Sequence, residues 1–261
     1  MSRARPLGGV LAFAVLAALP CVCSAAQDAE AGPIDLSGTW AELQVCSQIE
    51  VLPLVGHVTS TSRSLLRATA DQSGSGLIFR ETYCSTVIDT GSALAKTVIP
   101  GAFLASLGEL VRPAFLDASG ATIQFVQPWY TQVRGARLVD PENDPLPTSP
   151  DDPRVLDQDG DGKPGLTVKV TLMGILSGEA YVVQRVRYRM LGTVISAARI
   201  TGLIEWTNEQ VTIGASSPLF GVDTKPTPNP VPEKSYFVMA RIPATADCAE
   251  IVADEKTLFG R

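Results

Sequence analysis

Leu166-Thr-Val-Lys-Val-Thr-Leu-Met-Gly-Ile-Leu176 is the segment with the most regular side-chain pattern in this chain. Leucine and valine occupy alternate positions, and Thr167, Lys169 and Thr171 occupy the positions between them. Successive side chains of a strand point to opposite faces of a sheet. This period of two therefore predicts a β-strand with one buried face and one solvated face.

Two more alternating segments follow, at residues 180–191 and 195–207. Ser177-Gly178 and Gly192-Thr193 predict tight turns between the three strands. Three long strands joined by short turns form an antiparallel meander with one buried face. Strands of this length favour a strongly curved sheet over a sandwich of short strands.

Weaker β-strand signals lie on both sides of this meander. They cover residues 64–70, 77–83, 121–130, 210–214 and 235–242. The glycines between the first two predict a hairpin turn, and Pro128 places the third at an edge or a bend. Short helices are expected at 100–108 and after Thr245, which can cap one. We predict an all-β fold, an antiparallel meander forming a barrel or strongly bent sandwich, with one or two short helices.

The N-terminus is typical of a secretory signal peptide. Two arginines precede an apolar run from Leu7 to Leu19, and Ser24-Ala-Ala26 supplies small residues for cleavage after Ala26. The run of about 13 residues is shorter than the roughly 20 that cross a bilayer. Lipid attachment at Cys21 or Cys23 is the alternative, but neither has a small residue before it.

We therefore expect a signal peptide at 1–26 and a single β-rich domain at 27–261 in a secreted or periplasmic protein, with no transmembrane segment. The formal net charge of −6 becomes −8 when the two arginines of the signal are removed. An acidic protein is a poor match for nucleic-acid phosphates, so no nucleic-acid partner is expected.

Three cysteines remain after cleavage: Cys46, Cys84 and Cys248. In an oxidising compartment two of them usually pair and the third stays free. All three pairings are open, and the positions of Cys46 and Cys84 near the ends of early strands favour that pair. A nucleophilic cysteine is disfavoured because nothing nearby in the sequence would lower its pKa.

Residues 140–165 differ in composition from the rest of the chain. They hold many prolines and acidic residues and end in Asp157-Gln-Asp-Gly-Asp-Gly-Lys-Pro-Gly165. Regular secondary structure is not expected in such a segment. Three aspartates at alternate positions, separated by glycines, are the pattern of a loop that binds a hard cation. We interpret the segment as a long ordered loop closed by a metal site.

This loop resembles the calcium loops of FG-GAP repeats and, more loosely, those of dockerins and EF-hands. The resemblance implies Ca²⁺ bound by the carboxylates of Asp157, Asp159 and Asp161 and by the main-chain oxygen of Lys163. The chain departs from those loops at position 9, which is Gly165, and at position 12, which is Val168. Without those acids the ion is expected to be structural, completed by water or by acids at 151–152.

Gly38-Thr-Trp40 opens the first expected strand and resembles the Gly-x-Trp start of lipocalins, in which the tryptophan closes the barrel floor. The resemblance implies a carrier of a small hydrophobic ligand. Two other features have plainer interpretations. Arg185, Arg187 and Arg189 alternate on the polar face of one strand, as a solvated surface does, and His57 has no partner motif for catalysis.

No motif of an enzyme is present, so the sequence favours a non-enzymatic function. The first hypothesis is a secreted or periplasmic module with a structural calcium loop and an envelope or extracellular structural or binding role. The alternative is a lipocalin-like carrier. A cavity inside the barrel would favour the carrier.

Overall fold

The alternating segments form one antiparallel sheet of eleven strands in the part of the chain that the structure, a computed structural model, describes. That part comprises Met1 and residues 34–260, so the expected signal peptide lies outside the described residues apart from Met1. Pro33–Arg261 form one compact unit. No helix in the described part has the length and apolarity that a bilayer crossing requires.

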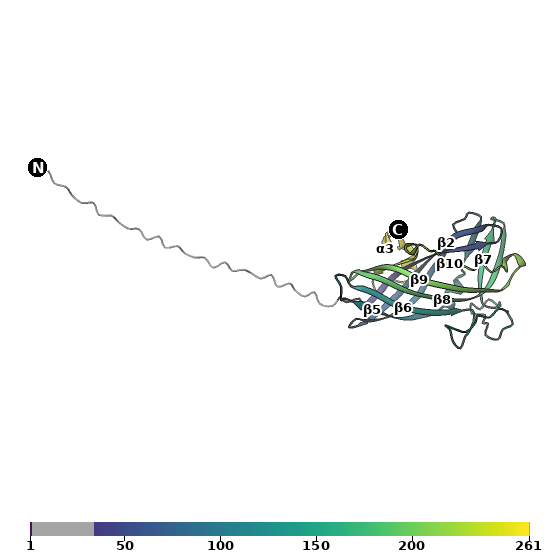
Figure 1. The fold of residues 1–261 in the computed structure, drawn as a ribbon, viewed down its shortest axis with the longest axis horizontal. Helices are drawn as coiled ribbons and strands as arrows, with labels where there is room; N and C mark the ends of the chain where they lie inside the picture. The colour runs from purple at the N-terminus through teal and green to yellow at the C-terminus, as the bar shows by residue number, and fades with distance from the viewer. Residues whose placement is uncertain (2–33, 261) are drawn as a thin grey trace. The chain divides into compact units, whose positions relative to one another are not determined.

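The elements follow one another in the order shown in Figure 1. The strands are β1 Gly38–Leu52, β2 Gly56–Ser73, β3 Gly76–Asp89, β4 Ala95–Val98, β5 Glu109–Asp117, β6 Gln124–Arg134, β7 Leu166–Leu172, β8 Leu176–Ser196, β9 Arg199–Ala215, β10 Thr227–Pro228 and β11 Tyr236–Arg241. The helices are α1 Gly101–Ser106, α2 Cys248–Ala253 and α3 Glu255–Phe259, with 3₁₀ turns η1 Pro218–Phe220 and η2 Pro232–Lys234.

Eight of the strands close into a ring, which confirms the predicted fold class. The pairing order is β1-β2-β3-β5-β6-β8-β9-β11, and β11 returns to β1. β4 and β7 form a second connection between β3 and β8. Every neighbouring pair is antiparallel, and because successive side chains of a strand point to opposite faces, alternate residues of each strand face the interior of the barrel.

The turns of the meander are not where the sequence placed them. β7 turns into β8 at Met173-Gly174-Ile175, where Met173 and Gly174 have positive φ, and β8 turns into β9 after Ser196. Ser177-Gly178 and Gly192-Thr193 lie inside β8. The prediction of turns at these two sites was wrong because those glycines have a packing role.

Gly192 and Gly202 are paired across β8 and β9 and leave room for the ring of Phe237. A Cβ atom on Gly192 would lie 2.7 Å from this ring, and one on Gly202 would lie 2.6 Å from it. Gly178 makes room for Phe220 in the same way. These glycines let large side chains reach the sheet surface and do not bend the chain.

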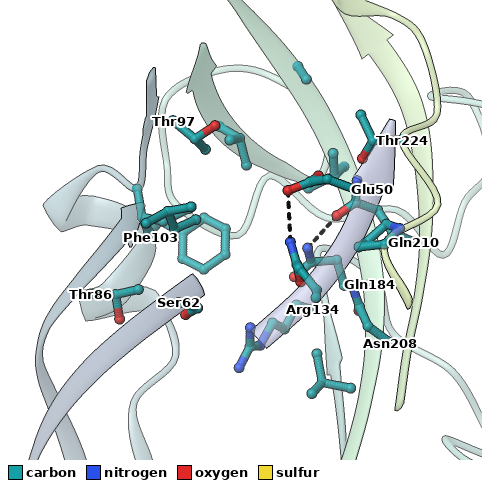
Figure 2. Close-up of a pocket in the computed structure, with 18 of the residues that line it drawn as sticks. Glu50, Ser62, Thr86, Thr97, Phe103, Arg134, Gln184, Asn208, Gln210 and Thr224 are labelled. Atoms are coloured by element: carbon teal, nitrogen blue, oxygen red, sulfur yellow. Dashed lines mark hydrogen bonds between the residues drawn. The ribbon is translucent and has the colours of Figure 1, made fainter. Parts of the chain in front are cut away.

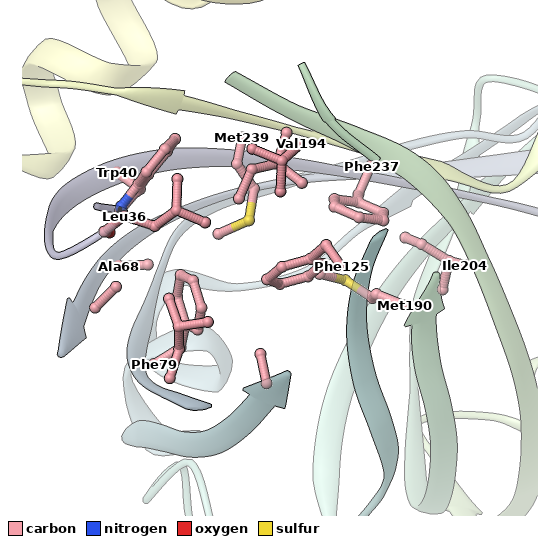
Figure 3. Packing of buried hydrophobic residues seen from close by; sticks show 14 of the residues in the cluster. Leu36, Trp40, Ala68, Phe79, Phe125, Met190, Val194, Ile204, Phe237 and Met239 are labelled. Carbon is pink, nitrogen blue, oxygen red and sulfur yellow. Dashed lines mark hydrogen bonds between the residues drawn. The ribbon is translucent and has the colours of Figure 1, made fainter. Parts of the chain in front are cut away.

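One end of the barrel is filled with apolar side chains (Figure 3). Phe125 packs against both Phe79 and Phe237, with ring centroids 5.7 and 5.9 Å apart. Trp40 is fully buried there and donates its indole N–H to the Leu36 carbonyl oxygen at 3.0 Å. This floor closes the barrel near the start of β1.

The disulfide joins Cys84 to Cys248 and leaves Cys46 free, so the favoured pairing of Cys46 with Cys84 was wrong. Cys46 shares the inward face of β1 with Trp40, whereas Cys84 packs with the cluster that includes Ile251 of α2. The two cysteines therefore lie on opposite faces of the barrel wall. The disulfide fixes α2 to β3 from outside.

Helix α2 begins at a capping box formed by Asp247 and Glu250, so its N-cap lies two residues after the expected Thr245 cap. The expected helix at 100–108 is confirmed by α1. Pro128 lies in a bulge of β6, as a bend required.

The segment 140–165 contains no helix and only isolated bridges. It is held to the barrel by Arg185, whose Nη1 donates to the carbonyl oxygens of Pro141 and Asp144 at 3.2 and 2.9 Å. On the same face, Arg185 pairs with Glu209 and Arg189 pairs with Glu205. Two arginines of the stripe are thus paired with acids, and Arg185 also anchors the loop, whereas Arg187 lies over the ring of Trp129 at 6.0 Å and its buried Nε has no partner among the described residues.

Candidate functional site

The other half of the barrel encloses a cavity of about 230 Å³. Its apolar wall comes mainly from α1 and β7 and includes Phe103, Leu104, Leu107, Val168, Val170 and Leu172. Its polar wall comes mainly from β1, β8 and β9 and includes Gln44, Gln48, Glu50, Gln184, Asn208, Gln210 and Thr212. Figure 2 shows Phe103 on one side of the cavity and Glu50, Gln184 and Gln210 on the other. The cavity is amphipathic.

A buried ionic cluster separates the cavity from the apolar floor. Arg112 of β5 is 1% exposed, and its Nη2 lies 2.6 Å from a carboxylate oxygen of Glu81 and 3.7 Å from one of Glu42. Its guanidinium also covers the ring of Tyr188, 4.6 Å from the centroid. Both carboxylates are fully buried, so one cation faces two acids in a region of low dielectric.

Glu42 is the weakly paired acid of this cluster. Burial and the nearby charge of Glu81 raise the pKa of Glu42 to about 8, against the opposing effect of Arg112. Its Oε1 accepts a hydrogen bond from Gln44 at 2.6 Å, whereas its Oε2 has no partner among the described residues. At neutral pH Glu42 is therefore mostly protonated, and Arg112 forms its ion pair with Glu81.

Arg134, Tyr83 and Tyr188 line the base of the cavity, and the first two are hydrogen-bonded to each other. Arg134, at the end of β6, donates from Nε to the Oε1 of Gln132 at 2.9 Å and from Nη2 to the hydroxyl oxygen of Tyr83 at 3.5 Å. Tyr188 lines the same cavity, and its buried hydroxyl has no partner among the described residues. Burial raises the pKa of Tyr83 and of Tyr188, so both phenols keep their protons at neutral pH.

Cys46 also lines the cavity. Burial raises the pKa of its thiol to about 12, although the positive charge of Arg134 opposes that shift. A thiol with this pKa is a poor nucleophile.

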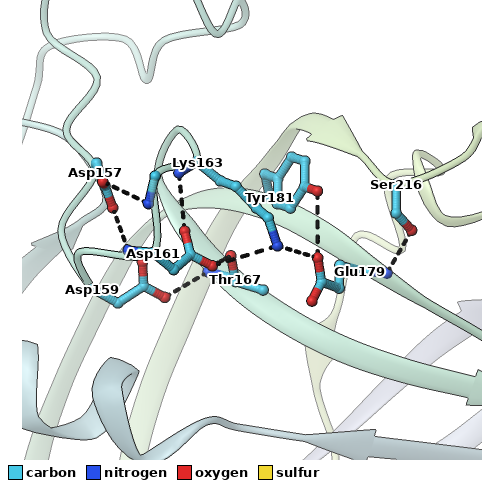
Figure 4. Close-up of polar contacts among 9 residues, drawn as sticks. Asp157, Asp159, Asp161, Lys163, Thr167, Glu179, Tyr181 and Ser216 are labelled. Carbon is cyan, nitrogen blue, oxygen red and sulfur yellow. Dashed lines mark hydrogen bonds and ion pairs between the residues drawn. The ribbon is translucent and has the colours of Figure 1, made fainter.

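The aspartate loop is the second candidate site (Figure 4). The structure brings Asp157, Asp159 and Asp161 together, with one carboxylate oxygen of each within 4.8 Å of the others. Asp157 accepts the amide protons of Asp161 and Gly162 at 3.1 and 2.9 Å, which folds the loop back on itself. This geometry could hold a cation ligated by oxygen.

The remaining contacts of the loop leave one carboxylate oxygen of the three aspartates without a hydrogen-bond partner among the described residues. Thr167 donates its amide proton to Asp159 Oδ2 at 3.0 Å and its hydroxyl proton to Asp161 Oδ2 at 2.6 Å. Asp159 Oδ1 is buried without a partner among the described residues. The Lys163 ammonium lies 3.7 Å from Asp161 and pairs with Glu179, which raises the pKa of Lys163. The lysine thus neutralises part of the acidic charge.

The two departures from the calcium-loop pattern have a structural reason. A Cβ atom on Gly165 would lie 2.5 Å from the carbonyl oxygen of Val182, so no side chain fits at position 9. Val168, at position 12, faces the cavity. A cation in this loop would therefore depend on the three aspartates, main-chain oxygens and water.

The sequence pattern predicted the aspartate loop, but it did not lead to the buried cluster or the base of the cavity. A signal was present in β1, where Glu42, Gln44 and Cys46 occupy the same alternate positions as Trp40 and therefore share its inward face. His57 is exposed at the start of β2, away from the cavity lining.

The chain matches no family model, no curated protein sequence and no solved structure. Function must therefore be argued from the site.

Proposed function

We propose that this protein binds a small amphiphilic molecule inside its barrel, as a carrier or sensor without catalysis. The observation that supports the proposal is the half-filled barrel, in which a floor of large side chains stops below a cavity with one apolar and one polar wall. Ligand cavities combine apolar surface with a few polar groups that orient the ligand. The cavity therefore favours the carrier over a purely structural module.

The size of the cavity limits the ligand. An apolar cavity of about 150 Å³ accepts benzene, so the present volume corresponds to roughly nine non-hydrogen atoms. Long-chain lipids do not fit within this volume. The expected ligands are short amphiphiles with one polar end.

The test is a binding screen against neutral, anionic and cationic amphiphiles of this size, monitored by saturation-transfer NMR. Val186→Phe places a larger side chain in the cavity and should abolish every signal. Val87→Phe is the matched control, because Val87 is 63% exposed on the outer face of β3. Equal signals from the protein and from Val186→Phe, or no signal from any compound, would contradict the proposal.

We also propose that the aspartate loop binds Ca²⁺ as a structural ion, through Asp157, Asp159, Asp161 and the main-chain oxygen of Lys163. The unpartnered oxygen of Asp159 supports this second proposal. The loop leads directly into β7, which supplies part of the apolar wall of the cavity. A bound ion would stiffen this wall and the segment 140–165.

Thermal unfolding tests the calcium proposal. With a dissociation constant on the order of 1 mM, typical of extracellular modules, 10 mM Ca²⁺ adds about 1.4 kcal/mol. The midpoint should rise by about 3 to 6 °C over that in chelator. Asp159→Asn should remove this increase, whereas Asp71→Asn, at an exposed position of β2 away from the loop, should retain it. An unchanged midpoint in 10 mM Ca²⁺ would contradict the proposal that this loop binds calcium.

A further inference from the structure

We propose that the cavity selects a small organic monocarboxylate, whose carboxylate lies against Arg134 and Tyr83 and whose apolar part lies against α1 and β7. This inference rests on the proposed function, because it names the chemical class of the ligand for the same cavity.

The first step is the charge of Arg134. Within residues 34–260, no carboxylate lies within 4.0 Å of its guanidinium, and the partners of its N–H groups are the neutral Gln132 and Tyr83. Its Nη1 donates to no described residue. An Arg guanidinium that faces a cavity with a free donor edge matches a carboxylate in charge and in geometry.

The second step is the direction of the neighbouring hydroxyl groups. Tyr83 accepts a hydrogen bond from Arg134, so its own proton remains available to a ligand. Tyr188 also lines the cavity, but its hydroxyl is buried in the wall and presents no surface to a ligand, so the phenol that can donate to the carboxylate is that of Tyr83.

The third step is the charge balance of the interior. Glu81 and Arg112 neutralise each other below the cavity. Among the described residues of the lining, Arg134 is the basic group and Glu50 the acidic one, and Glu50 accepts its hydrogen bonds from Gln48 and Ser60. Arg134 is therefore left for a ligand carboxylate, whereas a second negative charge on the ligand would meet no further cation.

The opposite end of the ligand is defined by Phe103, Leu104 and Val170. With roughly nine non-hydrogen atoms available, a short aliphatic or a one-ring carboxylate fills the space. Heptanoate is a suitable probe, and heptanamide is its neutral counterpart with the same number of non-hydrogen atoms.

The experiment measures the affinity of both probes at pH 7 by NMR titration of the full mature chain. Heptanoate should bind at least tenfold more tightly than heptanamide. Arg134→Gln should weaken heptanoate binding by about tenfold to a hundredfold, as expected for hydrogen bonds to a charged group, and leave heptanamide unchanged. Arg137→Gln removes the same charge from an exposed position and should leave both affinities unchanged.

Tyr83→Phe is the second variant, and it tests the inference without a change of charge. It removes the hydroxyl that would donate to the carboxylate and keeps the ring that packs against the Phe103 cluster. Heptanoate affinity should fall by roughly twofold to tenfold.

Three kinds of result overturn the inference, and they differ in what they imply for the proposed function. If heptanamide binds as tightly as heptanoate, or if Arg134→Gln leaves heptanoate affinity unchanged, the ligand class is wrong and the binding function stands. If neither probe binds but neutral or cationic amphiphiles do, the inference fails alone. If no amphiphile of any charge binds, the inference and the proposed function fail together.

Discussion

Replacement of Glu42 by glutamine should stabilise this protein at neutral pH. Glu42 has a pKa of about 8 in the folded chain and an ordinary value of 4.5. Because the pKa is raised on folding, the contribution of Glu42 to stability is fully present below pH 4.5. It is lost progressively as the pH rises toward 8.

The magnitude follows from this difference. At pH 7 the unfolded chain has an ionised Glu42, and folding must protonate it against a pKa 2.5 units below the pH. At about 1.36 kcal/mol per unit, this costs about 3 kcal/mol, and at pH 8 it costs more than 4 kcal/mol. Glutamine has the shape of the protonated acid and can accept the hydrogen bond from Gln44 without this cost.

The assay is urea unfolding at pH 4, 7 and 8, followed by circular dichroism. Glu42→Gln should match the unchanged protein at pH 4 and exceed its free energy of unfolding by about 3 kcal/mol at pH 7. Glu109→Gln is the control, because Glu109 is exposed and pairs with Arg80 on the surface, where effects stay within about 0.5 kcal/mol. A loss of stability in Glu42→Gln at pH 7 would mean that Glu42 is ionised in the fold.

Three more substitutions test the surrounding structure. Arg112→Met leaves Glu81 buried without its cation, so the free energy of unfolding in urea should fall by about 3–5 kcal/mol. Adding Glu81→Gln to this variant should recover most of that loss. Replacing both Cys84 and Cys248 by serine opens a loop of 164 residues and should cost about 5 kcal/mol, whereas Cys46→Ser should leave the disulfide and its contribution intact. Arg185→Ala removes the donors to Pro141 and Asp144, so limited proteolysis should cut segment 140–165 faster, and equal rates would show that the arginine does not hold the loop.

The sequence predicted the sheet because alternation is a local property. The runs at 166–176 and 180–191 show the period of two that any half-buried strand requires. The turns were harder to place, because Gly178 and Gly192 suggest turns locally but make room for the rings of Phe220 and Phe237, which lie far away in the chain. A glycine in the sequence can indicate a turn or can make room within a strand for a side chain from elsewhere, and only the fold distinguishes the two.

The site shows the same division between local and distant causes. Asp157, Asp159 and Asp161 lie close together in the sequence, so their proximity in space was predictable. The cavity groups Tyr83, Arg134 and Tyr188 come from three strands, and only closure of the barrel brings them together. The role of each group depends on whether another part of the chain supplies it with a hydrogen-bond or ion-pair partner, and a local sequence pattern does not contain that information.

The arrangement of charges inside the barrel argues that the cavity is a binding site and not a packing defect. A barrel of this size can be filled by side chains, and its floor is filled by Trp40 and the rings around it. The chain nevertheless places the half-buried Arg134 in the lining of the upper half, where no carboxylate of the described residues pairs with it. Apolar side chains at this position would fill the space as the floor is filled, so a packing defect gives no reason for a cation with an unused donor edge. A ligand carboxylate does give one, because it matches a guanidinium in charge and in geometry.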